Sequence, residues 1–305
     1  MPPPTRLRLG TRGSALARAQ AMAVARDLEL RHPGLAVELV LVRTTGDRLQ
    51  QGPLAPAGGK GLFVKELEEG LLAGSIDFAV HSLKDVPAVV PGGLAIAAIP
   101  ERADPRDVLV SREEGLAALP FGARLGTASV RRRAQLLARR RDLHVVVLRG
   151  NVDTRLRRWR EGEFTAIVLA AAGLARLGID EPDARPLSPD VLLPAVGQGA
   201  LALECRSDDA ATRALLVALD HGPSARAVAA ERAFLLGIGG DCNTPIAAHA
   251  TVDDQHLVLR ARVSDLDGVQ CLEDTIEGAT ADAEDLGRRL AERLLARGAG
   301  AVIGR

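Results

Sequence analysis

The sequence predicts an α/β protein of two α/β units, joined by a crossover and a return, and a small C-terminal α+β domain. Short apolar runs alternate with helical patterns up to about residue 194. From residue 246 the pattern changes to three strands and a helix. With 305 residues, the chain is long enough for two or three domains of ordinary size.

The composition is that of a folded globular protein, with 47% apolar and 26% charged residues. Thirty-nine basic residues balance thirty-nine acidic ones, so the chain as a whole has no attraction for nucleic acid or anionic membrane. Aromatic residues are only 2%, which disfavours stacking platforms for single-stranded nucleic acid. We therefore expect neither nucleic acid nor a membrane among the partners.

Cysteine and histidine usage argues against metal and disulfide chemistry. Three distant cysteines do not form a disulfide framework, and six scattered histidines show no metal-ligand spacing. No apolar h-region follows Met1 to Arg6, and no window is apolar enough to span a membrane. The expectation is a cytoplasmic protein without a metal.

The first α/β unit begins with strands at 6–10 and 37–42 around a helix at 15–31, for which Ser14 is the expected N-cap. The turn before this helix places Arg12 and hydroxyl groups beside helix N-terminal amides. Such a turn suits a carboxylate or a phosphate.

A glycine- and proline-rich stretch at 44–61 precedes a helix at 62–73. A loop of this length predicts a mobile lid, which would carry the cation Lys60. The next apolar run, at 78–83, stops abruptly in Lys84 and Asp85. Open α/β sheets bind ligands at the carboxyl ends of their strands, so Asp85 is the first candidate for chemistry, although a solvated turn before a proline is the alternative.

A polar, proline-flanked segment at 100–106 separates strands at 94–99 and 108–110 and predicts the crossover into the second unit. There, strands at 124–126, 145–148 and 166–169 each lead into a helix through a junction that carries arginine. This repetition is the strongest signal in the chain, because arginine at a strand end is a natural bidentate partner for carboxylate or phosphate.

Between residues 130 and 160 there are eleven arginines but only two carboxylates, Asp142 and Asp153. We interpret the arginines inside the helices as a solvated basic face: Arg139, Arg140, Arg141, Arg157, Arg158 and Arg160. The arginines at strand ends are the candidate anion ligands: Arg131, Arg132, Arg149, Arg155 and Arg176.

A glycine-flanked segment at 194–205 predicts the return into the first unit, followed by helices at 210–219 and 224–236. Cys205 and Cys271 lie in strand-like surroundings and are expected in cores. Cys242 lies in a glycine-rich loop, where packing gives little reason for a thiol. A reactive or covalently modified cysteine is predicted there, and no neighbouring histidine supports a Cys-His protease.

Nine stretches in order resemble the porphobilinogen deaminase family, also called hydroxymethylbilane synthase. They follow one another in order between residues 11 and 250, and the remainder of the chain fits the family's third domain. The stretches are TRGSALARAQ, GGKGLFVKELE, FAVHSLKDVP, ERADPRD, GTASVRRRAQL, LRGNVDTRL, AAAGLARLG, LPAVGQGALALECR and GGDCNTPIAAHA.

The resemblance implies two periplasmic-binding-protein-like domains, at 1–102 with 197–220 and at 103–196, and an α+β domain at 221–305. It also implies a transferase of haem, porphyrin and tetrapyrrole biosynthesis that acts as a monomer. Such an enzyme condenses four porphobilinogen units, each with an acetate and a propionate, into linear hydroxymethylbilane and releases ammonia. The primer is a dipyrromethane cofactor, joined by a thioether to the cysteine that matches Cys242.

By the same resemblance, Asp85 is catalytic, because a carboxylate that faces pyrrole N–H groups stabilises the positive charge of the azafulvene left by ammonia loss. The residues implied to face substrate are Arg12, Arg149, Arg155, Gln20 and Lys60. The residues implied to hold cofactor carboxylates, besides the attachment at Cys242, are Ser14, Lys84, Thr127, Ser129, Arg131, Arg132 and Arg176.

Two other classes of protein could use the same features. A bilobal module that binds an anionic ligand would use the arginines, but it would have no need for a cysteine in a glycine-rich loop. A nucleic-acid-binding protein could use the basic cluster, but the neutral overall charge and the scarcity of aromatic residues disfavour it.

Overall fold

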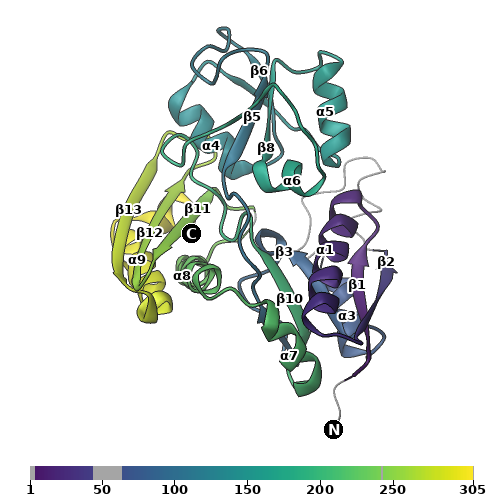
Figure 1. Cartoon of the computed structure of the whole chain (residues 1–305). Helices are drawn as coiled ribbons and strands as arrows, with labels where there is room; N and C mark the ends of the chain where they lie inside the picture. The colour runs from purple at the N-terminus through teal and green to yellow at the C-terminus, as the bar shows by residue number, and fades with distance from the viewer. Residues whose placement is uncertain (1–3, 44–63, 242, 305) are drawn as a thin grey trace. The chain divides into compact units, whose positions relative to one another are not determined.

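The structure is a computed structural model that describes residues 4–43, 64–241 and 243–304. It separates into two compact units, and each is described by itself (Figure 1). Unit 1 comprises residues 1–102 and 200–225, and unit 2 comprises residues 103–199 and 226–305. The predicted crossover near residue 102 and the return near residue 200 are where the chain passes between these units. The division into three domains with the bounds given above stays a prediction.

Unit 1 contains a five-stranded mixed sheet in the order β2-β1-β3-β10-β4. Strand β1 runs parallel to β2 and β3, whereas β10 is antiparallel to β3 and β4. The return strand β10 thus completes the first sheet, as the sequence predicts. The strands are β1 (Arg6–Arg12), β2 (Ala36–Val42), β3 (Phe78–Ser82), β4 (Leu94–Ala98) and β10 (Leu201–Arg206).

Helix α1 (Ala15–Arg31) covers this sheet and has the bounds that the sequence predicts. Its buried face places Val24 and Leu28 in one core with Leu9 and Phe78. Ser14 is its N-cap, as predicted, because the Ser14 hydroxyl accepts a hydrogen bond from the Ala17 amide at 3.3 Å. The other helices that lie wholly within the described part of unit 1 are α3 (Lys65–Leu72), η1 (Leu83–Asp85), α7 (Ala210–Leu216) and η2 (Val217–Leu219).

The first sheet of unit 2 also has five strands, in the order β7-β6-β8-β5-β9. Strands β6, β7 and β8 are parallel, and β5 is antiparallel to β8 and β9. The strands are β5 (Asp107–Ser111), β6 (Arg124–Gly126), β7 (His144–Val146), β8 (Ala166–Ala170) and β9 (Ala184–Pro186). Helices α4 (Val130–Arg139), α5 (Val152–Arg160) and α6 (Ala171–Arg176) follow β6, β7 and β8.

The rest of unit 2 is an antiparallel three-stranded sheet, β11-β12-β13, with helix α9 packed against it (Figure 1). This confirms the α+β character that the sequence predicts for the C-terminal region. Cys271, at the start of β13, is exposed, so its expected core position is wrong, whereas Cys205 is buried. The elements are α8 (Gly222–Ile238), β11 (Ile246–Asp253), β12 (His256–Ser264), β13 (Cys271–Ala279), η3 (Thr280–Asp282), α9 (Ala283–Ala296) and α10 (Ala299–Val302).

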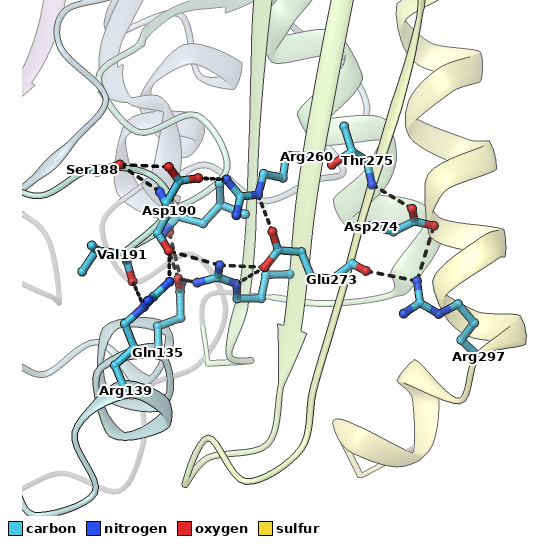
Figure 2. Close-up of polar contacts among 12 residues, drawn as sticks. Gln135, Arg139, Ser188, Asp190, Val191, Arg260, Glu273, Asp274, Thr275 and Arg297 are labelled. Atoms are coloured by element: carbon cyan, nitrogen blue, oxygen red, sulfur yellow. Dashed lines mark hydrogen bonds and ion pairs between the residues drawn. The ribbon is translucent and has the colours of Figure 1, made fainter.

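A charged network joins the three-stranded sheet to α4 and to the segment after β9 (Figure 2). Arg262 of β12 donates to Gln135 of α4 at 2.6 Å and to Glu273 of β13 at 2.7 Å. Arg260 pairs with both Glu273 and Asp190, which belongs to the segment after β9. Burial by itself raises the pKa of Glu273, but its hydrogen bonds with the two arginines outweigh burial and lower this pKa.

Replacing Glu273 with glutamine is expected to lower the melting temperature at neutral pH, with a loss of about 1–3 kcal/mol for hydrogen bonds to a charged group. Because the folded-state pKa of Glu273 lies below the unfolded value of about 4.3, its contribution is present above that pH and disappears as pH falls through the folded value. Calorimetry should therefore show the difference between Glu273→Gln and wild type narrowing below about pH 4. Glu161→Gln, which breaks an exposed pair with Arg157, is the control and should shift stability by less than about 1 kcal/mol.

Candidate active site

In unit 1, the predicted site residues gather at the carboxyl edge of the sheet. Strands β1 and β3 are parallel neighbours, with Leu9 opposite Phe78 and Gly10 opposite Ala79. Arg12 ends β1, and the segment from Ser82 to Asp85 ends β3, so these residues leave the sheet at the same edge. The expectation that Lys84 and Asp85 lie at a carboxyl edge is confirmed.

Asp85 is an exposed side chain on a firmly held turn. It closes the short helix η1, whose neighbours Leu83 and Val86 are 1% and 6% exposed. The Leu83 amide donates to the Ala200 carbonyl at 3.1 Å, and the Val86 amide donates to the Leu83 carbonyl at 3.0 Å. A carboxylate on such a turn is accessible to a ligand while its backbone stays fixed.

Gln20 has a supporting position behind this turn. It lies on α1, is 4% exposed, and donates from Nε2 to the Ser82 hydroxyl at 3.1 Å. Deeper in the sheet, His81 of β3 lies 3.0 Å from the buried carboxylate of Glu204 on β10. Both contacts fix the end of the strand that carries Asp85, and the sequence pattern did not reveal either of them.

In unit 2, the carboxyl ends of β6, β7 and β8 lie at one edge because these strands are parallel. After β6, the Thr127 hydroxyl accepts from the Ser129 amide at 3.2 Å, and the Ser129 hydroxyl caps α4 by accepting from the Arg132 amide at 3.4 Å. Each hydroxyl keeps its proton, which can be donated to an anion. The edge thus combines hydroxyl donors with the arginines of α4.

Arg131 and Arg132 are buried, with 4% and 5% exposure, around the fully buried carboxylate of Asp107. Arg132 donates to Asp107 from Nε at 3.0 Å and from an Nη atom at 2.7 Å, while an Nη atom of Arg131 lies 2.8 Å from the other oxygen. Burial raises the pKa of Asp107, but the two guanidinium groups outweigh it and lower the pKa to about 2. Two positive charges therefore share one negative charge in the interior.

The other strand-end arginines differ in their surroundings. Arg176, on α6, donates to the Gly199 carbonyl at 2.6 Å, and burial lowers its pKa to about 10. Arg155 donates from Nε at 2.7 Å to the carbonyl of Gly150, whose φ of 113° favours glycine. Arg149, after β7, is exposed, and its guanidinium makes no hydrogen bond or ion pair with the described part of the chain.

These arginines leave buried positive charge without a matching carboxylate. The group of Arg131, Arg132 and Asp107 has one surplus positive charge, and Arg176 has no carboxylate partner within residues 4–43, 64–241 and 243–304. Buried Arg131 Nε also has no hydrogen-bond acceptor among these residues. An uncompensated buried charge costs several kcal/mol, so the edge is suited to an anion with several oxygen acceptors.

The arginines predicted as a solvated face are mostly exposed, yet each has a partner. Arg157, Arg158 and Arg160 pair with glutamates, and Arg140 pairs with Asp142. Arg139 and Arg141 donate to backbone carbonyls of the segments at 190–191 and 267–268. These side chains are structural, which leaves the strand-end arginines as the candidate ligands.

Two predicted site residues, Lys60 and Cys242, lie outside the described residues. The neighbours of Cys242 are described. The Asp241 carboxylate accepts from the Asn243 amide and from the Thr244 hydroxyl, each at 2.9 Å. Asp241 is thus engaged in shaping the loop that carries the cysteine.

Comparison with known proteins now adds to this geometry. Residues 7–214 match the family model described as porphobilinogen deaminase, dipyromethane cofactor binding domain. The chain belongs to the porphobilinogen deaminase family. Residues 225–296 also match the C-terminal domain model of porphobilinogen deaminase. The resemblance that the sequence motifs indicate is therefore confirmed, and with it the activity of hydroxymethylbilane synthase, a transferase of tetrapyrrole biosynthesis that uses a dipyrromethane cofactor.

Curated relatives span nearly the whole chain. Porphobilinogen deaminase of Syntrophotalea carbinolica is 54% identical over 97% of this chain and 95% of its own length. The porphobilinogen deaminase of Trichlorobacter lovleyi is 51% identical over 98% of this chain and 96% of its own. Among solved structures, the methionine binding protein MetQ covers 70% of this chain and 89% of its own at 14% identity, with a TM-score of 0.44. That score is too low to add to the fold described above.

The arginine-lined edge fits the cofactor of a porphobilinogen deaminase. A dipyrromethane made from porphobilinogen carries carboxylates, which would supply oxygen acceptors and counter-charges of the kind that this edge lacks, where Arg131 and Arg132 would hold it. Across the described ranges, no His, Cys, Asp and Glu group could hold a metal ion, and no helix is long and apolar enough to cross a membrane.

Sequence reasoning missed three buried polar residues of this chain, Asp107, Gln198 and Glu231. Asp107 opens a strand whose next three residues, at 108–110, are apolar, and this pattern was a signal for a buried carboxylate. Glu231 of α8 is fully buried and accepts from the Gly197 amide at 2.6 Å and the Ala250 amide at 2.8 Å. It ties the return segment to β11.

Proposed function

We propose that this chain adds four porphobilinogen units head to tail onto a dipyrromethane primer attached by a thioether to Cys242, with Asp85 as the catalytic carboxylate. Each addition forms one carbon–carbon bond and releases one ammonia. Cleavage of the bond between the primer and the first added unit, with addition of one water, then releases linear hydroxymethylbilane and leaves the primer on the protein. When bound, the dipyrromethane supplies the pyrrole carbon to which substrate is joined. The residues of the chain bind carboxylates, orient rings and handle protons.

The observation that carries the proposal is the surplus of buried guanidinium charge in unit 2. Every pyrrole in the reaction bears an acetate and a propionate, so a growing chain brings several carboxylates into the protein. Arg131 and Arg132 are already buried, Arg176 is partly buried, and all three are held by hydrogen bonds to backbone carbonyls. They offer positive charge without further reorganisation, which is how preorganised sites stabilise anions. Thr127, Ser129, Ser14 and Lys84 are also proposed to hold cofactor carboxylates.

Asp85 is proposed to stabilise the positive charge that develops when porphobilinogen loses ammonia and to accept hydrogen bonds from pyrrole N–H groups. Its exposure on the η1 turn supports this role, since a ligand can reach the carboxylate. A carboxylate in this position also assists loss of the ring proton after the new carbon–carbon bond forms. Arg12, Arg149, Arg155, Gln20 and Lys60 are proposed to contact the incoming substrate.

We further propose that the protein works in the cytoplasm as a monomer and without a metal. Equal numbers of acidic and basic residues support the absence of a nucleic-acid or membrane partner. Its partner is the small substrate porphobilinogen.

The activity is tested by incubating purified protein with porphobilinogen and following substrate, ammonia and product by mass spectrometry. Consumption of four porphobilinogens with release of four ammonias per linear tetrapyrrole is expected. Porphobilinogen that is bound but not consumed would contradict the proposal and favour a module that only binds an anionic ligand.

Arg149→Leu is expected to lower kcat/KM for porphobilinogen about 10- to 100-fold, since it removes a charge-assisted hydrogen bond to a substrate carboxylate. The melting temperature should change little, because the exposed Arg149 side chain contacts none of the described residues by hydrogen bond or ion pair. Arg157→Leu, on the exposed face of α5, is the matched control. Equal kinetics for the two variants would remove Arg149 from the substrate site.

A further inference from the structure

Asp107 lies where the chain enters the second sheet, at the start of β5. It is fully buried and faces two guanidinium groups, which use its two oxygens differently. Arg132 forms two hydrogen bonds to Oδ1, and Arg131 forms the ion pair with Oδ2. Each arginine has a second anchor on the backbone: Arg132 donates to the Val168 carbonyl at 2.8 Å and Arg131 to the Leu193 carbonyl at 2.6 Å.

Gln198 fixes Asp107 from the segment that leaves this sheet. Its amide nitrogen donates to Asp107 Oδ1 at 3.0 Å and to the Pro105 carbonyl at 2.7 Å. The next residue, Gly199, lies close to the entering segment, since an added Cβ would come within 2.4 Å of the Ala103 carbonyl. Gln198 therefore connects the segment that enters the sheet with the segment that leaves it, and it also binds Asp107, the carboxylate that accepts from both arginines.

The two guanidinium groups repel each other, and Asp107 is the only carboxylate that pairs with them in the described part of unit 2. Without that charge they would separate or turn toward other acceptors. A carboxylate ligand needs them side by side, because a planar guanidinium binds a carboxylate only when its N–H groups are aimed at it. Holding them before the ligand arrives lowers the entropy cost of binding.

We propose that Asp107 and Gln198 are positioning residues that hold Arg131 and Arg132 in the geometry needed to bind the carboxylates of the dipyrromethane. This inference rests on the proposed function. According to this proposal, the segments that contain Asp107 and Gln198 contribute to cofactor binding as well as connecting the two units. Gln198 acts through Asp107, and Asp107 acts through the arginines.

The test uses protein produced without porphobilinogen and then exposed to it at increasing concentrations. The covalently loaded fraction is read from intact mass. Asp107→Asn keeps the shape of the side chain and removes its charge. It should raise the porphobilinogen concentration for half-maximal loading at least tenfold. Asp142→Asn removes another partly buried carboxylate paired with arginine in unit 2 and should leave loading unchanged.

Gln198→Leu provides a second, milder variant that leaves all three charges in place. It should raise the porphobilinogen concentration for half-maximal loading several-fold. Its melting temperature should equal that of Asp142→Asn. The inference would be overturned if Gln198→Leu had a reduced melting temperature but needed the same porphobilinogen concentration as wild type for half-maximal loading. If Asp107→Asn does not fold, the result for Gln198→Leu decides the question. Wild-type protein that never gains mass would instead overturn the proposed function.

Discussion

Asp85→Asn is expected to keep the fold and the bound cofactor while slowing substrate addition by a factor of about 10²–10⁴, the range for removal of a general acid or base. Asparagine has the shape of aspartate but cannot take a proton or balance a developing positive charge. The turn itself should be unaffected, because it is held by buried Leu83 and Val86 and by backbone hydrogen bonds. Single-turnover rates by rapid quench and the melting temperature measure the two effects separately.

The control for this variant is Asp27→Asn, the same chemical change at an exposed position of α1. It should show wild-type rates. If Asp85→Asn adds porphobilinogen at a rate within about threefold of the control, Asp85 has no role in proton transfer. A variant that instead lacks the cofactor would show that Asp85 acts in building the primer rather than in extending it.

Local sequence patterns predicted the elements around the site because their causes are local. Ser14 caps α1, and the helix bounds follow from the cap and from the His-Pro-Gly stop at 32–34. Strands that end abruptly in polar residues placed Asp85 and the arginines at the carboxyl edges of two sheets. To predict that a residue lies at the carboxyl edge of a sheet, one needs only the end of its strand and the parallel pairing of the strands. Both follow from the alternation of strands and helices in the sequence.

The burial of Arg131 and Arg132 could not be predicted in this way. Their anchors are far away in sequence: Asp107 lies 25 residues before Arg132, and Leu193 lies 62 residues after Arg131. The position of Arg131 and Arg132 after a strand predicts an anion ligand, but it does not reveal that a carboxylate of the protein already lies between them. The same limit applies to Cys271, where strand-like surroundings predict a core position but the strand begins at an exposed edge.

The proposed roles of Asp85 and the arginine pair agree with their different surroundings. In unit 1, Asp85 is exposed on a turn fixed through its neighbours, whereas in unit 2 Arg131 and Arg132 are buried and fixed through their own side chains. A proton-transfer group must approach successive substrates, and this favours an accessible side chain. An anchor for permanent carboxylates benefits from low dielectric, because the attraction between opposite charges increases as water is excluded.

Cys242→Ala is expected to abolish covalent cofactor completely. Wild-type protein from a host that makes porphobilinogen should be heavier than its sequence by two porphobilinogen units less two ammonias, because each thioether or carbon–carbon bond forms with loss of one ammonia. The alanine variant should have the mass of its sequence alone. It should also lack turnover, since there is no primer to extend.

Cys271→Ala is the matched control, because Cys271 is an exposed thiol and should compete for any non-specific alkylation. If the surplus mass is absent from Cys271→Ala but present in Cys242→Ala, the proposed attachment site is wrong. Surplus mass in wild type and in the Cys271 variant, but not in the Cys242 variant, would place the thioether in the glycine-rich loop.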